Sequence, residues 1–301
     1  MIQPGWACPV CGAREWRPAY RHREAAAPVA EAPLQPSASA YGTTLGPVAR
    51  CLACGHGSVV ESPAGDSLTE AYGEVSDTVS LEEEAGQVAT ARRALDLVAR
   101  FTAPRRLVDL GCWTGSLLVA AGERGWDAVG IEPSAWAAAR ARERGASVAG
   151  RDLFQPGLPQ GAFDVVTMCD VLEHVGDPAA AIRVAAGLLT ERGVLYITVP
   201  NAGSAVARLL GRRWWSVLPM HLQYFTRASL RLLLERQGLA PRVMRTHAKV
   251  FTARYYAERL GGYSDGLARL AVAGATAVRL ADRLVAPNLG DRLQVVATRR
   301  V

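Results

Sequence analysis

The chain has 301 residues, of which 50% are hydrophobic, and its formal net charge is +6. This length allows one substantial hydrophobic core and a small accessory module, and the apolar content excludes a disordered chain. No apolar run reaches membrane-spanning length, and residues 1–6 lack the basic and apolar regions of a signal peptide. We therefore expect a cytoplasmic protein without a transmembrane segment.

The positive charge comes almost entirely from arginine, since Lys249 is the only lysine. The arginines are scattered along the whole chain, which is typical of solvated faces and not of a nucleic-acid-binding stripe. Composition therefore does not indicate a nucleic-acid partner. It also gives no indication of the oligomeric state.

The first 65 residues contain two C-x-x-C-G motifs, with an Ala/Pro/Ser-rich segment between them. The cysteines are Cys8, Cys11, Cys51 and Cys54, and two such motifs can place four thiolates around one zinc ion. Two disulfides or a redox pair are the alternatives, and both fit poorly with a cytoplasmic protein that shows no β-α-β pattern here. A site of four cysteines has no open coordination position, so we predict a structural zinc ribbon over residues 1–65.

Residues 66–105 are predicted to form a polar, acidic connector followed by a helix over 86–101 that caps the cofactor pocket. From residue 106 to residue 301, apolar strands alternate with helices. The expected strands are 106–110, 126–131, 146–150, 163–168, 193–199, 240–246 and 291–298, and the expected helices are 115–124, 133–144, 177–190 and 227–237. This alternation predicts a doubly wound, Rossmann-like α/β fold with a seven-stranded, mainly parallel sheet. Two insertions, near 202–220 and 247–287, are expected to act as lids.

The segment 106–116, Arg-Leu-Val-Asp-Leu-Gly-Cys-Trp-Thr-Gly-Ser, reads as a buried strand that turns through glycines into a helix. Gly111 and Gly115 allow the backbone to turn tightly and a ligand to approach. The dinucleotide fingerprint requires glycine where this chain has Trp113 and Ser116. A pyrophosphate cannot lie against that backbone, so the pattern favours a cofactor without phosphates.

Further polar residues follow the next strands of the predicted sheet. Glu132 comes directly after the strand 126–131, where a carboxylate can accept hydrogen bonds from both hydroxyls of a ribose. Asp152 and the segment 169–174 follow later strands. Because ligands of doubly wound sheets bind beyond the carboxyl ends of the strands, we expect all these residues at one site.

At this point three motifs stand in order: D-x-G-C-x-x-G at 109–115, the acidic residue 132, and D-V-L-E-H-V-x-D-P at 170–178. Over residues 85–245 the chain resembles the class I S-adenosylmethionine-dependent methyltransferases. The resemblance implies S-adenosylmethionine as the cofactor. The cofactor-binding residues that it implies, together with the two cysteines beside the strands, are Asp109, Gly111, Cys112, Gly115, Glu132, Asp152, Leu153 and Cys169.

The resemblance also implies a role for several of these residues. Asp109 organises the loop around the methionine portion, Glu132 holds the ribose, and Asp152 or Leu153 meets the adenine. A helix cap or a solvated aspartate is an equally good interpretation of Asp152. Cys112 and Cys169 are expected to be small buried residues beside the cofactor and not nucleophiles.

Methylation of a hydroxyl needs an in-line acceptor and a base. His174 and His221 are candidates as a pair, although a single histidine is more often structural. Together with Asp170 and Glu173 they are similar to the ligand set of some metal-dependent O-methyltransferases, including small-RNA terminal and ubiquinone-pathway enzymes. Asp170 departs from the glutamate often found at its position, and Glu173 equally suits a helix cap, so a divalent cation is the less favoured interpretation.

The two insertions carry amphipathic patterns. In the first, Trp214 and Trp215 beside two arginines suit either substrate contact, which we slightly favour, or pinning of the loop onto the core. In the second, residues 266–285 suit either a membrane surface or a lid packed on the domain. Its charged residues favour the lid.

These observations predict methyl transfer to a small-molecule acceptor, as O-methylation of a sugar or secondary-metabolite hydroxyl. One alternative is a sugar C-methyltransferase, a family that also places a four-cysteine module before such a core but normally continues into a further C-terminal domain. Another is an RNA-directed methyltransferase or a zinc-ribbon binding module. Its basic and aromatic patch would consist of Trp16, Arg17, Tyr20, Arg21 and Arg23.

Overall fold

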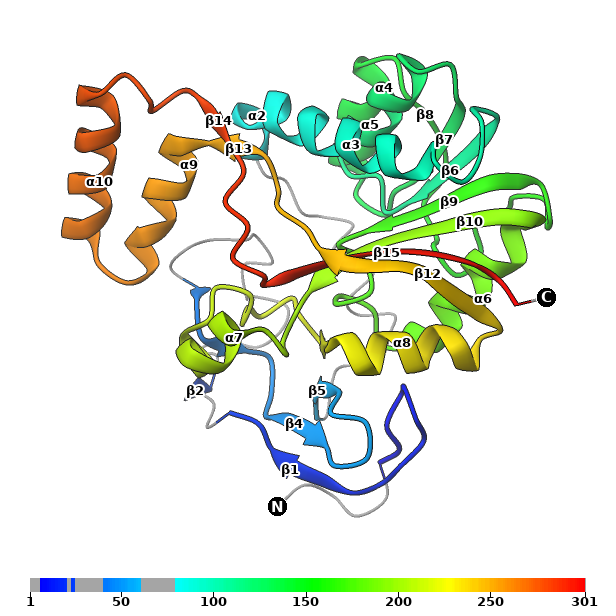
Figure 1. Ribbon diagram of the computed structural model, residues 1–301, viewed down its shortest axis with the longest axis horizontal. Coiled ribbons are helices and arrows are strands. Elements are labelled where there is room, and N and C mark those ends of the chain that lie inside the picture. The colour runs from blue at the N-terminus through cyan, green and yellow to red at the C-terminus, as the bar shows by residue number, and fades with distance from the viewer. Residues whose placement is uncertain (1–5, 21–22, 25–39, 61–78, 301) are drawn as a thin grey trace.

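The computed structural model describes residues 6–20, 23–24, 40–60 and 79–300, and is organised around one seven-stranded sheet (Figure 1). The strand order is β12-β15-β10-β9-β6-β7-β8. These strands are β6 (Arg106–Leu110), β7 (Asp127–Ile131), β8 (Ser147–Gly150), β9 (Phe163–Cys169), β10 (Leu189–Pro200), β12 (Leu239–Thr246) and β15 (Arg292–Arg299). Only β15 runs antiparallel to its neighbours. The predicted doubly wound, mainly parallel α/β fold is confirmed.

The strand order places a reversal of direction at the centre of the sheet. The chain proceeds from β6 outward through β7 and β8, and then returns to the other side of β6 to form β9 and β10. Ligands of open α/β sheets bind beyond the carboxyl ends of the strands at such a switch point. Asp109 and Cys169 lie at the ends of the two strands that meet there, β6 and β9.

Helices cover both faces of the sheet and bury its apolar side chains (Figure 1). On one face lie α3 (Glu84–Val98) and α4 (Ser116–Gly122), with Leu95 and Leu117 in a shared apolar cluster. On the other face α6 (Pro178–Leu188) and α8 (Arg227–Arg236) contribute to a second cluster. The strands are near-continuous apolar runs because helices cover them on both sides. Helix α5 (Ala135–Glu143) follows β7.

The N-terminal segment shares a sheet with the C-terminal part of the chain. The four-stranded sheet β1-β4-β5-β11 contains β1 (Trp16–Pro18), β4 (Val48–Cys51), β5 (Gly57–Val59) and β11 (Gln223–Tyr224). Strand β11 pairs antiparallel with β5, and Cys8, Val10 and Cys51 belong to one of the main apolar clusters. The described residues before 61 are therefore joined to the rest of the molecule by backbone hydrogen bonds and by a common core.

Short elements complete the structure. They are β2 (Arg23–Glu24), β3 (Thr43–Thr44), α2 (Val79–Glu82), α7 (Ala205–Leu210), η2 (Gly211–Arg213), β13 (Phe251–Thr252), α9 (Ala253–Glu258), η3 (Arg259–Gly262), α10 (Asp265–Ala277) and β14 (Leu284–Val285). The last five form the second expected insertion, between β12 and β15. Helix α10 lies beside α9 but buries none of its own residues. Within the described ranges, no helix is long and apolar enough to cross a bilayer.

Two glycines near β7 offer a test of the packing. A Cβ at Gly130 would lie 2.4 Å from Cys112 Sγ, whereas a Cβ at Gly122, the last residue of α4, would meet nothing within 4 Å. We expect Gly130→Ala to lower the free energy of unfolding by about 1–3 kcal/mol through overpacking. We expect Gly122→Ala to raise it by roughly 0.5–1 kcal/mol through a smaller loss of chain entropy. Denaturant unfolding measures both, and equal effects would contradict this packing.

Candidate active site

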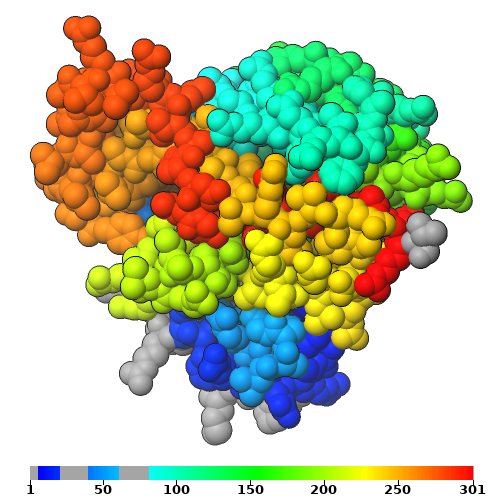
Figure 2. Space-filling view, viewed as in Figure 1, coloured from blue at the N-terminus to red at the C-terminus, as the bar shows by residue number. Residues whose placement is uncertain are grey.

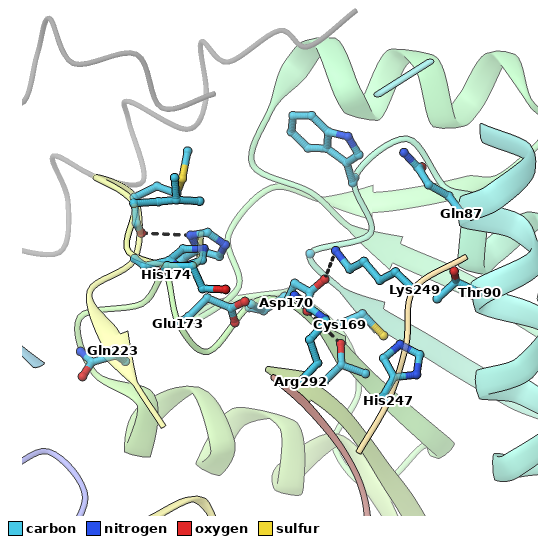
Figure 3. A pocket seen from close by; sticks show the side chains of 18 of the residues that line it. Gln87, Thr90, Cys169, Asp170, Glu173, His174, Gln223, His247, Lys249 and Arg292 are labelled. Carbon is cyan, nitrogen blue, oxygen red and sulfur yellow. Dashed lines mark hydrogen bonds and ion pairs between the residues drawn. The ribbon is translucent and has the colours of Figure 1, made fainter. Parts of the chain in front are cut away.

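A single cavity of about 1270 Å³ opens at the carboxyl ends of the central strands (Figure 3). Its walls include the loops after the strands, residues 83–94 at and within helix α3, and residues 58–60 of the N-terminal segment. Residues 215–221 of the first insertion, residues 247–263 of the second and residues 287–292 also line it. This volume exceeds the roughly 300–1,000 Å³ typical of a pocket for one drug-sized ligand. The cavity has room for a cofactor and an acceptor together.

Backbone conformation and close packing explain why the loop after β6 has glycine at two positions. Gly111 and Gly115 have φ angles of 78° and 79°, which glycine adopts without steric cost. A Cβ at Gly111 would lie 2.6 Å from Val171 Cγ2, and one at Gly115 would lie 2.9 Å from Ala141 Cβ. Both glycines are therefore required by the chain itself, and the turn that they allow places the loop along the cavity wall.

Glu132 is buried directly after β7 and ties the loop to that strand. Its Oε2 accepts the backbone N–H of Trp113 at 2.8 Å, and its Oε1 accepts that of Ser134 at 2.8 Å. Burial raises the pKa of this carboxyl, and the two N–H donors act in the opposite direction. A carboxylate has roughly four lone-pair positions, so two bonds leave capacity for a ligand's hydroxyls. Glu132 also lines the cavity.

Asp109 is buried at the end of β6, where Thr167 Oγ1 donates a hydrogen bond to its Oδ1 at 2.6 Å. Burial, and to a lesser degree the charge of Glu132, raises the pKa of Asp109 to about 7, against the effect of the Thr167 bond. The neighbouring thiol of Cys112 is also buried and that of Cys169 is partly buried, and desolvation raises the pKa of both. They line the cavity as neutral groups.

Asp152 and Leu153 lie on the cavity wall after β8. Asp152 Oδ1 accepts the backbone N–H of Phe154 at 2.7 Å and that of Gln155 at 3.2 Å, so its carboxylate caps a turn. Leu153 is buried. This pair thus offers an apolar surface held in place by a capped turn.

Glu173, His174 and His221 come together on the other side of the cavity. One potential ligand atom from each lies within 4.8 Å of the others, and the imidazole centroids are 4.8 Å apart. The Nδ1–H of His174 donates to Met220 O at 3.0 Å, and that of His221 donates to Ser216 O at 2.7 Å. These two bonds fix both rings with the lone pair on Nε2, which is the reactive nitrogen of each ring.

Burial decides the charge of this cluster. It lowers the pKa of His174 to about 4 and depresses that of His221, so both imidazoles are neutral at pH 7. It raises the pKa of Glu173 to about 8, and Glu173 Oε2 has no hydrogen-bond partner among the described residues. Glu173 does not cap a helix, since Asp177 caps α6. A buried, unpaired carboxyl oxygen beside two imidazoles is a feature of functional sites.

Asp170 lies outside this cluster and belongs to an ion-paired group (Figure 3). Lys249 Nζ is 2.5 Å from its Oδ2, and Arg292 contacts its Oδ1, which also accepts Thr198 Oγ1. Its φ of 58° is left-handed, a conformation that aspartate tolerates better than most residues. The sequence analysis did not identify Lys249 and Arg292 as partners of Asp170. The only signal was that Lys249 is the single lysine of an arginine-rich chain.

Aromatic side chains line the end of the cavity that is formed by the N-terminal segment and the two insertions. They include Tyr41, Trp215, Phe251, Tyr255, Tyr256 and Tyr263. Trp215 Nε1 donates to Asp291 at 2.8 Å, whereas Trp214 is fully buried in a core cluster. Of the predicted tryptophan pair, one ring therefore faces the cavity and the other holds the insertion. Arg259 lies over the Tyr255 ring at 4.6 Å and also lines this end.

This combination defines a class of protein. A doubly wound sheet with a glycine turn after its central strand and an acidic residue after the next is the architecture of class I S-adenosylmethionine-dependent methyltransferases. The family model of the methyltransferase domain matches residues 84–243, which is more than half of the 301 residues. The chain belongs to this family.

Known proteins agree on the fold. A chain of the Haloferax volcanii complex that contains the Trm112 methyltransferase activator superposes with a TM-score of 0.53 at 17% identity, covering 80% of this chain and 99% of that one. A SAM-dependent methyltransferase from Archaeoglobus fulgidus gives 0.52 at 16% identity, covering 74% and 100%. Identities this low show the fold alone.

One curated relative is the ubiquinone biosynthesis O-methyltransferase of Methylococcus capsulatus. It is 37% identical over 106 residues, which cover 33% of this chain and 45% of that protein. The chain spans about half the length of the curated relatives it matches.

Proposed function

We propose that the protein transfers the methyl group of S-adenosylmethionine to a hydroxyl of a small molecule. The observation that carries this proposal is one cavity that holds, at one end, the glycine loop and Glu132, and at the other the Glu173, His174 and His221 cluster. The family assignment supports the cofactor. The name of the Methylococcus relative supports an oxygen acceptor.

The cofactor would occupy the end built by β6, β7 and β8. Asp109 and the glycine turn would hold the methionine portion, and the free lone pairs of Glu132 would accept the ribose hydroxyls. Leu153 would contact the adenine through its apolar surface. The capped turn at Asp152 keeps that surface in place.

Glu132 provides the first test. We expect Glu132→Ala to weaken the binding of S-adenosylmethionine and of its demethylated product by roughly ten- to hundredfold, because about 0.5–1.5 kcal/mol is lost for each of two ribose bonds. Asp127→Ala, at the opposite and exposed end of the same strand, should leave affinity unchanged. Titration calorimetry measures both. Unchanged affinity in Glu132→Ala would contradict the ribose assignment, and tight nicotinamide-dinucleotide binding would contradict the cofactor.

The acceptor hydroxyl would be placed next to the two imidazoles. Its oxygen attacks the methyl carbon, the carbon–sulfur bond breaks with its electron pair going to sulfur, and the hydroxyl proton passes to Nε2 of one histidine. Burial keeps both rings neutral, so Nε2 can accept that proton at pH 7. The backbone carbonyls of Met220 and Ser216 then stabilise the charged ring by accepting its Nδ1–H.

The second test replaces each histidine with asparagine, whose amide can still donate to the same carbonyl. We expect the variant of the proton acceptor, His174→Asn or His221→Asn, to lower turnover by about 100- to 10,000-fold and to leave cofactor affinity nearly intact. The measurement is formation of a product heavier by one methylene in a metabolite extract from cells that lack the protein. Full turnover in both variants would refute the base assignment.

A divalent cation is a second candidate for the same cluster. Glu173, His174 and His221 fit such an ion, because both rings bond a backbone carbonyl through Nδ1 and one carboxylate oxygen lacks a partner. The ion would act as a Lewis acid toward the acceptor oxygen. This version would be favoured if chelation abolished turnover and added magnesium or manganese restored it. The Glu173→Gln variant should then no longer respond to the added metal.

The residues at the acceptor end of the cavity suit an acceptor molecule that contains a ring. Aromatic walls with one guanidinium suit a sugar or a planar secondary metabolite through stacking and cation–π contact. The RNA-directed alternative gains little support: the Trp16 ring stacks on Trp6 at 4.3 Å, and Tyr20 packs edge-on against Tyr224. Arg21 lies outside the described residues.

We also propose that Cys8, Cys11, Cys51 and Cys54 hold one structural zinc. Their sulfurs lie within 4.8 Å of one another, with 3.7 Å between Cys8 and Cys54 and 3.6 Å between Cys11 and Cys51. A tetrahedron of roughly 2.3 Å Zn–S bonds has edges of about 3.8 Å, whereas a disulfide would require about 2.05 Å.

The third test is metal analysis of protein purified under reducing conditions. We expect one zinc per chain, and its loss in Cys51→Ser together with a lower melting temperature, because structural zinc contributes directly to folding. Cofactor affinity should persist, since the glycine loop and Glu132 lie in the other part of the fold. Protein without zinc, or with two disulfides, would refute the site.

A further inference from the structure

The segment from Tyr263 to Leu289 carries an unusual share of the exposed apolar surface. It contains eight of the twelve large hydrophobic side chains that are exposed in the described part of the chain. They are Tyr263, Leu267, Leu270, Val278, Leu280, Leu284, Val285 and Leu289. Single exposed leucines are ordinary on protein surfaces, but a contiguous group marks a binding site.

Helix α10 arranges part of this group as a stripe. Leu267, Leu270 and Val278 are spaced by three and eight residues, which places them on one side of a helix and its C-terminal turn. The helix packs on α9 through its other side, and Figures 1 and 2 show the pair projecting from the body of the protein. Leu270 is 72% exposed, so the stripe faces solvent. The stripe does not seal the cavity.

Basic residues accompany the stripe. Arg269, Arg279 and Arg283 are exposed, and none of them forms an ion pair with another described residue. Of the two acidic residues in the segment, Asp282 is neutralised by Arg254 at 2.9 Å. An apolar stripe with unpaired arginines matches a surface that is both apolar and anionic.

We propose that α10 and the residues up to Leu289 dock on the surface of an anionic lipid bilayer, with Leu267, Leu270 and Val278 entering the headgroup region. Arg279 and Arg283, which follow the helix, then contact lipid phosphates. Arg269 lies on the side of α10 away from the stripe. Such a helix lies in the interface and does not span the membrane, which agrees with the length of 13 residues for α10.

Docking has a consequence for the cavity, and this consequence rests on the proposed function. Tyr263 and Leu289, the two ends of the segment, line the cavity, as do Tyr255 in α9 and Arg259 in η3, which precede it. The mouth of the cavity would therefore lie against the lipid headgroups when the segment is docked. This arrangement favours an acceptor with an apolar tail that remains in the bilayer while its hydroxyl reaches His174 and His221.

Sedimentation of the full chain with vesicles tests the docking. We expect binding to an equal mixture of phosphatidylcholine and phosphatidylglycerol, weaker binding to phosphatidylcholine alone, and weakening by salt. Leu267→Glu/Leu270→Glu should reduce binding at least about tenfold, because two exposed leucines no longer enter the lipid. Arg279→Glu/Arg283→Glu should reduce it by about fivefold or more per residue.

Leu209→Glu is the matched control. Leu209 is 85% exposed on α7, outside the docking segment, so this variant should bind vesicles like the original protein. Equal loss in Leu209→Glu, or no binding to anionic vesicles, would overturn the proposal. The proposal would also be overturned if the protein formed a stable dimer in solution, if Leu267→Glu/Leu270→Glu dissociated that dimer, and if neither protein bound vesicles. Calorimetry with S-adenosylmethionine on the same samples separates failure of docking from failure of the proposed function.

Discussion

Two backbone hydrogen bonds to one carbonyl hold the acceptor side of the site together. The N–H groups of Leu222 and Gln223 both donate to Glu173 O, at 2.7 Å and 3.0 Å. They join the turn that carries Glu173 and His174 to strand β11, which leads back to His221. Together with the bond from His174 Nδ1 to Met220 O, they fix the geometry of a cluster whose residues come from two segments that lie far apart in the chain.

The same strand connects this turn to the cysteine segment. Gln223 pairs with Ser58 of β5, and its side-chain amide donates to Val175 O at 3.1 Å and to Gly176 O at 3.3 Å. His56 Nε2 bonds Gln223 Oε1 at 2.9 Å, two residues after Cys54. A buried path of hydrogen bonds therefore runs from the proposed zinc site to Glu173. The cysteine segment is thus a wall and a support of the acceptor site, and more than a stabilising appendage.

The cofactor end depends on a different constraint, the burial of two carboxyls. Asp109 and Glu132 lose hydration on burial. Asp109 accepts a hydrogen bond from Thr167, and Glu132 accepts the backbone N–H groups of Trp113 in the glycine loop and of Ser134. Burial makes such groups costly unless a partner satisfies them. The bond from Trp113 to Glu132 orders the glycine loop. Burial raises the pKa of both carboxyls, so a ligand that donates hydrogen bonds to them would stabilise their ionised forms.

Sequence reasoning found the parts of this protein that have local signatures. The central strands are continuous apolar runs because they are buried on both faces, and the turn from Asp109 to Gly115 and the acidic Glu132 after the next strand are recognisable from residue spacing alone. The cysteine cluster was likewise readable from its paired motifs.

Other features had no such signature. Strand β11 has two residues, which are too few to show an alternating pattern of apolar and polar side chains. It pairs with a strand about 165 positions earlier. The ion pairs of Asp170 with Lys249 and Arg292 depend on three distant segments that meet only in the folded chain. The exposure of α10 likewise cannot be read from an amphipathic pattern, because the same pattern suits a packed helix.

The most direct test of this account is hydrogen exchange at the amides of Leu222 and Gln223, measured with the intact cysteine site and with Cys51→Ser. The account predicts faster exchange at these two amides when the site is lost, because β5 and His56 no longer hold β11, while the amides of β6 keep their protection. Unchanged protection at Leu222 and Gln223 would show that the acceptor site is independent of the cysteine segment, and would contradict the account.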